Sequence, residues 1–156
     1  MSADRELRAE ITIEAGVDEV WAVLSDLGRM PEFSPETVRM IPLKRGGLRP
    51  GQWYLGINRR KFFVWPTRNV VADLAPAERL AWDTTSSGAR WIYELTPVGE
   101  GQTRVVHRRP VPAGSLALAS RIVAPLLLGG SESHADELEE GMGRTLAALK
   151  AAVERR

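Results

Sequence analysis

The stretch SESHADELEEGMGRTLAALKAAVERR, residues 131–156, decides how the rest of the chain is arranged. Its apolar side chains recur at steps of three and four, which places them on one face of an α-helix. They are Ala135, Leu138, Met142, Leu146, Leu149 and Val153. Ser131 or Ser133 can cap the start of this helix. A helix with one apolar stripe needs a large partner surface, so we expect a sheet elsewhere in the chain.

Two glycines, Gly141 and Gly143, flank Met142 inside the predicted helix. Each costs about 1 kcal/mol relative to alanine in a helix interior. Their presence indicates that something approaches the helix closely at this point. Tight packing of helix on sheet is one explanation and a bound molecule is the other, and the sequence leaves both open.

Composition limits the function classes. A chain of 156 residues is expected to form one domain, residues 1–156, with a core of its own. Lys and Arg number 21 and Asp and Glu number 20, a balance that argues against a dedicated nucleic-acid binder. The chain has no cysteine, which excludes disulfides, thiolate nucleophiles and Cys-ligated metals. Residues 1–10 are charged and carry no signal-peptide core, so we expect a cytoplasmic protein.

In the first part of the chain the spacing of the apolar residues changes from that of a strand to that of a helix. Residues 5–14 alternate between apolar and polar side chains, which predicts a strand with one wet face. Residues 17–27 place Val17, Val20, Trp21, Leu24 and Leu27 on one helical stripe, and Gly28 follows as a stop signal. Residues 29–35 suit a second short helix or a turn. The chain therefore begins with a strand and two short helices.

Residues 37–109 predict an antiparallel meander, because short Gly, Pro and Ser turns separate alternating segments. The expected strands are 37–44, 52–60, 62–74, 79–84, 90–95 and 103–109, with a turn at 97–101. Residues 113–128 are apolar almost throughout but are broken by Arg121 and Pro125, too short a run to span a bilayer. We interpret residues 113–130 as an apolar lid, and expect no integral membrane segment.

Several stretches resemble the START-like polyketide cyclase/dehydrase family, the SRPBCC or helix-grip superfamily. They are VWAVLSDL (20–27) with PEFSP (31–35), GIN (56–58) with Trp65, RLAW (79–82), RWIYELTP (90–97), TRV (103–105), and GM (141–142) with TLAALK (145–150). The resemblance implies an α+β helix-grip fold. In that fold a curved antiparallel sheet of about seven strands wraps around the long C-terminal helix, with a hydrophobic cavity between them.

His107 is the candidate catalytic residue. It follows Val105 at strand period, so both side chains share a face. If that face points inward, His107 is the one inward group that titrates near neutrality. It is then either a partly buried strand histidine with an ordinary hydrogen bond, or a cavity base or donor to a ligand carbonyl. Arg109 shares the face nearer the rim, where it can meet a carboxylate.

The remaining candidate ligand-binding residues are the wall of the implied cavity. Five tryptophans among only three Phe and two Tyr fit such a wall, because core side chains are also pocket lining in this fold. For Asn58 a turn-closing role and ligand binding are both open. The full set of predicted ligand-binding residues is Asn58, Trp65, Trp82, Trp91, Tyr93, His107, Arg109, Leu138 and Met142.

No catalytic motif is present in the sequence: there is no nucleophile elbow, no phosphate-binding glycine loop and no metal-spaced cluster. Asp83 and Glu94 lie opposite Trp82 and Tyr93 in the strand alternation, so they should face solvent and form no acid–base pair. We therefore expect no metal and no cofactor.

The sequence favours a carrier or sensor that binds a small hydrophobic, lipid- or polyketide-like molecule. The alternative is a cyclase or dehydrase-type enzyme acting on a carbonyl compound in the same cavity, with His107 or Arg109 handling protons or the enolate. A protein-interaction module that uses the lid is a third interpretation. A homodimer is left open.

Overall fold

The computed structural model describes residues 6–43, 47–85, 88–110 and 131–155, and the side chains of residues 131–135 are not described. The elements follow one another in the order β1 (Leu7–Ile13), α1 (Val17–Leu24), the 3-10 turn η1 (Leu27–Arg29), α2 (Met30–Phe33), β2 (Thr37–Pro42), β3 (Trp53–Arg60), β4 (Phe63–Ala75), β5 (Arg79–Thr84), β6 (Ala89–Gly99), β7 (Gln102–Arg109) and α4 (Ser131–Glu154).

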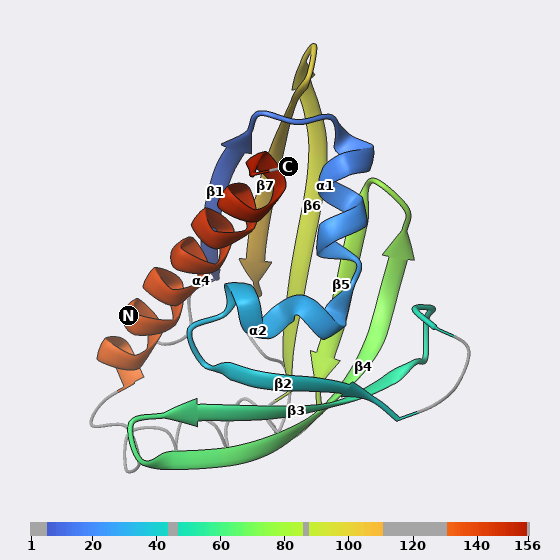
Figure 1. Ribbon diagram of the computed structural model, residues 1–156. Coiled ribbons are helices and arrows are strands. Elements are labelled where there is room, and N and C mark those ends of the chain that lie inside the picture. Colours follow the sequence, from blue (N-terminus) through green and yellow to red (C-terminus); the bar gives the residue numbers. More distant parts are fainter. Residues whose placement is uncertain (1–5, 44–46, 86–87, 111–130, 156) are drawn as a thin grey trace.

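The seven strands form one antiparallel sheet in the order β1-β7-β6-β5-β4-β3-β2. The sheet is curved, and the helices lie on its concave side with α4 running diagonally across it (Figure 1). Helix α4 packs against β1 and also contacts α1 and α2. The predicted α+β helix-grip fold is confirmed, since a curved sheet wraps around the C-terminal helix.

The apolar stripe of α4 is buried as its spacing predicts. Met142, Leu146, Leu149 and Val153 are each almost fully shielded from solvent, and Leu138 is half-buried. Strand β1 supplies Leu7 and Ile13 from its inner face. Burial of these side chains against the sheet is the main contribution to stability that the structure shows for α4.

Several element boundaries differ from the sequence-based prediction, and three of the differences have a clear physical cause. Helix α1 ends at Leu24 and not at residue 27, because Asp26 takes a non-helical ψ of 83° and the chain restarts as the 3-10 turn η1. Strand β2 stops at Pro42, which has no N–H to donate. Strand β6 continues through the predicted turn to Gly99, because Thr96 and Pro97 still pair with β7 before the register shifts.

The two helix glycines meet no close neighbour among the described residues. A Cβ on Gly141 would lie 3.6 Å from Cγ of Pro35, an ordinary contact, and a Cβ on Gly143 would meet nothing within 4 Å. Very tight packing therefore does not explain either glycine.

The predicted lid, residues 113–130, lies outside the described residues and stays a prediction. Among the residues that are described, no helix is long and apolar enough to cross a membrane.

Candidate functional site

The concave face of the sheet carries most of the predicted site residues, because paired strands place cross-strand neighbours on the same face. Asn58 pairs with Trp65 in the β3–β4 hairpin. Trp82 pairs with Trp91 between β5 and β6, and Tyr93 pairs with His107 between β6 and β7. The inward direction of Val105 and His107 is confirmed, since both side chains are buried.

A wall of aromatic rings crosses the centre of this face. The rings of Tyr93 and His107 stack with centroids 3.9 Å apart and planes 8° apart. Trp82 lies 5.7 Å from Tyr93 and Trp91 lies 5.9 Å from His107, both in tilted contacts. Burial raises the pKa of the Tyr93 phenol, which therefore stays protonated at neutral pH.

His107 is held as a neutral ring. Its Nδ1 lies 2.9 Å from the carbonyl oxygen of Ile92, and a carbonyl can only accept, so Nδ1 carries the proton. Burial lowers the pKa of His107 to about 4. The expectation that His107 titrates near neutrality is therefore wrong, because its imidazolium form would be desolvated. In the neutral ring Nε2 is an acceptor, so it does not serve as a donor to a ligand carbonyl.

Arg109 lies at the end of β7, opposite Leu7 of β1. Its guanidinium carbon is 5.5 Å from the centroid of the Trp91 ring, and its buried Nε has no hydrogen-bond partner among the described residues. Burial lowers the pKa of this guanidinium. Leu7 packs on Met142 and Leu138 of α4, with Trp91 against the same cluster, so these predicted residues meet at one end of the site.

A chain of neutral hydrogen bonds starts from the aromatic wall. Nε1 of Trp91 donates to Oγ1 of Thr84 over 3.2 Å, and Thr84 donates to Oδ1 of Asn69 over 2.7 Å. Nδ2 of Asn69 lies 3.5 Å from the carbonyl oxygens of both Tyr54 and Thr67. Since carbonyls only accept, this atom is the amide nitrogen. The donor and acceptor of every hydrogen bond from Trp91 to Asn69 are therefore fixed.

The hydroxyl of Thr67 lies at the middle of the chain and accepts two hydrogen bonds. Nδ2 of Asn69 donates to its oxygen over 3.2 Å, and Nδ2 of Asn58 donates over 3.0 Å. Asn58 also donates to the Trp65 carbonyl and accepts from Thr37. Both acceptor positions of the Thr67 oxygen are thus occupied, and no described residue accepts its hydrogen. The partly buried Thr67 hydroxyl can therefore donate its hydrogen to a water or a ligand on the concave face.

The predicted residues form two groups joined by this chain. Trp82, Trp91, Tyr93, His107 and Arg109 build the aromatic wall and its rim, and Leu138 and Met142 of α4 pack in one cluster with Trp91. Asn58 and Trp65 form the second group, in the β3–β4 hairpin. Asn58 does tie the hairpin to β2, and its part in ligand binding stays a prediction. Sequence reasoning missed Thr67, Asn69 and Thr84, because alternation places Thr67 and Asn69 on one face of β4 but does not reveal which side chains of the neighbouring strands they meet.

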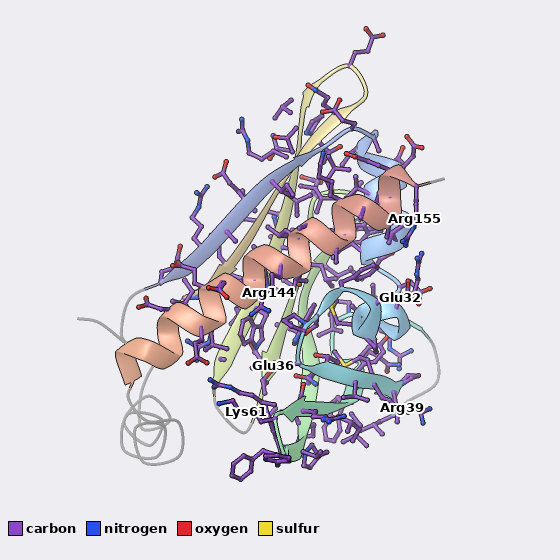
Figure 2. The ribbon with its side chains drawn as sticks, turned by 60° about the vertical axis from the view of Figure 1, so that its left-hand side comes forward. Glu32, Glu36, Arg39, Lys61, Arg144 and Arg155 are labelled. Carbon is purple, nitrogen blue, oxygen red and sulfur yellow. The ribbon has the colours of Figure 1, made fainter. Side chains whose placement is uncertain are left out.

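Glu36 was also missed. It follows α2 and is partly buried, and burial raises the pKa of its carboxyl, while Arg60 and Arg144 act in the opposite direction. In Figure 2 Glu36 is seen between Arg144 of α4 and Lys61. Arg60 itself is ion-paired with Glu137 of α4. Glu36 stands between Pro35 and the next strand, where no periodic pattern marks it.

The outer carboxylates behave as predicted. Asp83 pairs with Arg90, with a shortest distance of 2.7 Å, and Glu94 pairs with Arg108 at 3.0 Å, so neither faces the concave side. Among the described side chains, no group of three or more His, Asp or Glu residues is placed to hold a metal ion.

Comparison with models of known protein families shows which family the chain belongs to. The sequence model for "Polyketide cyclase / dehydrase and lipid transport" matches residues 4–154. The chain belongs to the polyketide cyclase/dehydrase and lipid transport family. No curated protein matches the sequence.

Solved structures of similar fold agree with this family. The chain is 23% identical to a Polyketide_cyc-like protein of Corynebacterium glutamicum, with a TM-score of 0.67, covering 96% of this chain and 91% of that one. It is 21% identical to the Zhui aromatase/cyclase of Streptomyces sp. R1128, with a TM-score of 0.70, covering 97% and 94%.

The di-domain aromatase/cyclase StfQ of the steffimycin biosynthetic pathway is 18% identical, with a TM-score of 0.70, covering 98% of this chain and 52% of that chain. Family and neighbours together support a ligand-binding cavity fold.

Proposed function

We propose that this family member binds a small hydrophobic, lipid- or polyketide-like molecule on the concave face of its sheet, as a carrier or sensor. The apolar body of the molecule would lie against Trp91, the partly exposed ring of the aromatic wall, next to the buried rings of Tyr93 and His107. Apolar pockets with a few placed polar groups are the usual form of small-molecule sites.

The observation that carries the proposal is the Thr67 hydroxyl. Asn58 and Asn69 occupy both of its acceptor positions, so its hydrogen has to be donated to another group. Water can accept this hydrogen at a partly exposed hydroxyl, and a ligand that displaces the water has to accept the bond in its place. A ligand oxygen, such as the carbonyl or phenol oxygen of a polyketide-like molecule, would supply the acceptor.

Binding without turnover is favoured by the charge state of the site. His107 is neutral at pH 7 with its proton fixed on Nδ1, and burial keeps the Tyr93 phenol protonated. Asp83 and Glu94 are used in ion pairs on the outer face. The aromatic wall therefore offers shape and hydrogen bonds and lacks an acid–base pair.

The second candidate is a cyclase or dehydrase-type enzyme on the same face. Two of the neighbours are named aromatase/cyclases, and Glu36 is a partly buried carboxyl whose pKa is raised by burial. A carboxyl with a raised pKa suits a general acid. In this case Glu36 would protonate a leaving hydroxyl or an enolate of a carbonyl substrate.

Native mass spectrometry of the protein expressed in bacteria tests the proposal first, by searching for a co-purified small molecule. Single-turnover analysis with that molecule then separates the two candidates. A carrier should release it unchanged, and Glu36→Gln should change its affinity only modestly. Conversion of the molecule, with a rate that Glu36→Gln lowers on the order of a hundredfold at unchanged affinity, would support the enzyme as the function.

A further inference from the structure

Residues 37–72 are strongly basic although the chain as a whole is balanced. This stretch holds eight Lys and Arg residues and no Asp or Glu, whereas the whole chain has 21 and 20. The remaining residues therefore hold thirteen basic and twenty acidic side chains. The stretch comprises β2, β3, their connection and the first part of β4. Six of these cations belong to described residues at this end of the sheet and give it a concentrated positive charge, with Arg60 among them paired to Glu137; they are Arg39, Arg49, Arg59, Arg60, Lys61 and Arg68.

The same stretch also exposes apolar side chains. Phe62 is 100% exposed, Phe63 69% and Val64 63%, and together they form the tip of the β3–β4 hairpin. Val38 and Leu43, from β2 and just beyond it, are each about half exposed. Of the large apolar side chains exposed among the described residues, Val98 alone lies outside this stretch. A cluster of this kind on a protein surface marks an interaction site.

The outer face behind this tip is apolar and basic as well. Tyr54 and Gly56 of β3 are buried on the inner face, so Leu55, Ile57 and Arg59 point outward. Arg68 of β4 lies over the Trp53 ring at 4.7 Å. The described helices are on the other side of the sheet (Figure 1). Arg39 of β2 pairs with Ile57, and Lys61 follows the end of β3, so both of these cations, labelled in Figure 2, belong to this layer.

We infer that the outer face of β2, β3 and the start of β4, with its tip Phe62–Phe63–Val64, is a docking surface for an anionic lipid bilayer. Aromatic side chains insert at the level of the lipid headgroups, and Lys and Arg are drawn to anionic lipid. Each cation close to such a surface strengthens binding roughly fivefold. This inference is independent of which molecule occupies the concave face.

Two other partners fit the surface less well. A second copy of the chain would bring two strongly basic regions together, and like charges across an interface repel. Nucleic acid would suit the charge, but the tip consists of Phe62, Phe63 and Val64, none of which can donate a hydrogen bond to phosphate or a base edge. Exposed apolar side chains beside cations match the apolar interior and the anionic headgroup layer of a bilayer surface.

Flotation with lipid vesicles tests the inference. The wild-type protein should float with vesicles of phosphatidylcholine and phosphatidylglycerol, should bind pure phosphatidylcholine far less, and should lose binding as salt is raised. The double variant Phe62→Ser/Phe63→Ser should bind on the order of a hundredfold less tightly. Arg59→Glu/Lys61→Glu should abolish the preference for phosphatidylglycerol.

Matched controls come from outside the stretch. Val98→Ser removes an exposed apolar side chain of β6, and Arg104→Glu reverses an exposed charge of β7, and both should bind as the wild type does. Equal binding by tip variants and controls would overturn the inference. A salt-sensitive complex with an oligonucleotide, or a dimer broken by Phe62→Ser/Phe63→Ser, in the absence of vesicle binding would also overturn it.

Discussion

A Cβ on Gly56 would lie 2.7 Å from the hydroxyl oxygen of Thr67 and 3.0 Å from the amide nitrogen of Asn69. Cross-strand pairing places Gly56 directly opposite Thr67, so the missing side chain is what lets the hydroxyl accept from both asparagines. We predict that Gly56→Ala destabilises the protein by about 1–3 kcal/mol, since an added methyl group in a packed site displaces its neighbours. Denaturant unfolding measures this loss.

A second glycine-to-alanine substitution should raise the free energy of unfolding and not lower it. Gly143 lies in the middle of α4, and a Cβ there would meet no described residue within 4 Å. Gly143→Ala should therefore stabilise the protein by about 0.5–1 kcal/mol through helix propensity alone. A loss of stability in the same unfolding experiment would show that something else occupies the space next to Gly143.

Leu146 should be among the most costly positions of α4. Its side chain is 1% exposed and belongs to the main core cluster with Val105 and Tyr93. Leu146→Ala should cost about 2–5 kcal/mol, from lost transfer free energy plus a cavity. Glu140→Ala on the exposed side of the helix is the control. A similar melting temperature for both variants would mean that α4 does not hold the core.

Acid should destabilise the protein partly through His107. Burial lowers the folded-state pKa to about 4, whereas an unfolded histidine titrates near about 6.5. The unfolded state binds more protons between these values, so stability falls as pH decreases through this window, by at most about 3 kcal/mol. His107→Gln removes this contribution. Its free energy of unfolding, measured from about pH 7.5 to about pH 4.5, should therefore depend less on pH than that of the wild type. Identical slopes would contradict the buried neutral ring.

Periodic signals in the sequence predicted the helices and strands, and the resemblance to the polyketide cyclase/dehydrase family implied how they pack. The three- and four-residue steps from Leu138 to Val153 describe the buried side of α4, and the alternation of Thr103, Val105 and His107 describes the inner face of β7. Burial of one face imposes these periods, so they can be read without coordinates. The ends of strands and helices were harder to predict from the sequence. Strand β6 continues to Gly99 because its pairing with β7 outweighs the tendency of Pro97 to end a strand.

The hydrogen-bonded chain could not be predicted, because it depends on register. Thr84 meets Asn69, and Thr67 meets Gly56, only through the pairing of β4 with its two neighbours. A shift of one residue would turn each of these side chains to the other face. The ionisation of His107 was misjudged for a related reason: its pKa follows from how deeply β7 is buried, which strand period does not reveal.

The central claim is that Thr67 donates a hydrogen bond to a hydrophobic ligand on the concave face. The most direct test is the affinity of Thr67→Val for the co-purified molecule and, in parallel, for anilinonaphthalene sulfonate. Valine keeps the shape and removes the hydroxyl. The comparison is Thr103→Val, whose buried hydroxyl already donates to the Ala15 carbonyl over 2.8 Å. We predict that Thr67→Val binds roughly three- to tenfold more weakly, and that Thr103→Val loses stability with unchanged affinity. Unchanged affinity in Thr67→Val would contradict the account.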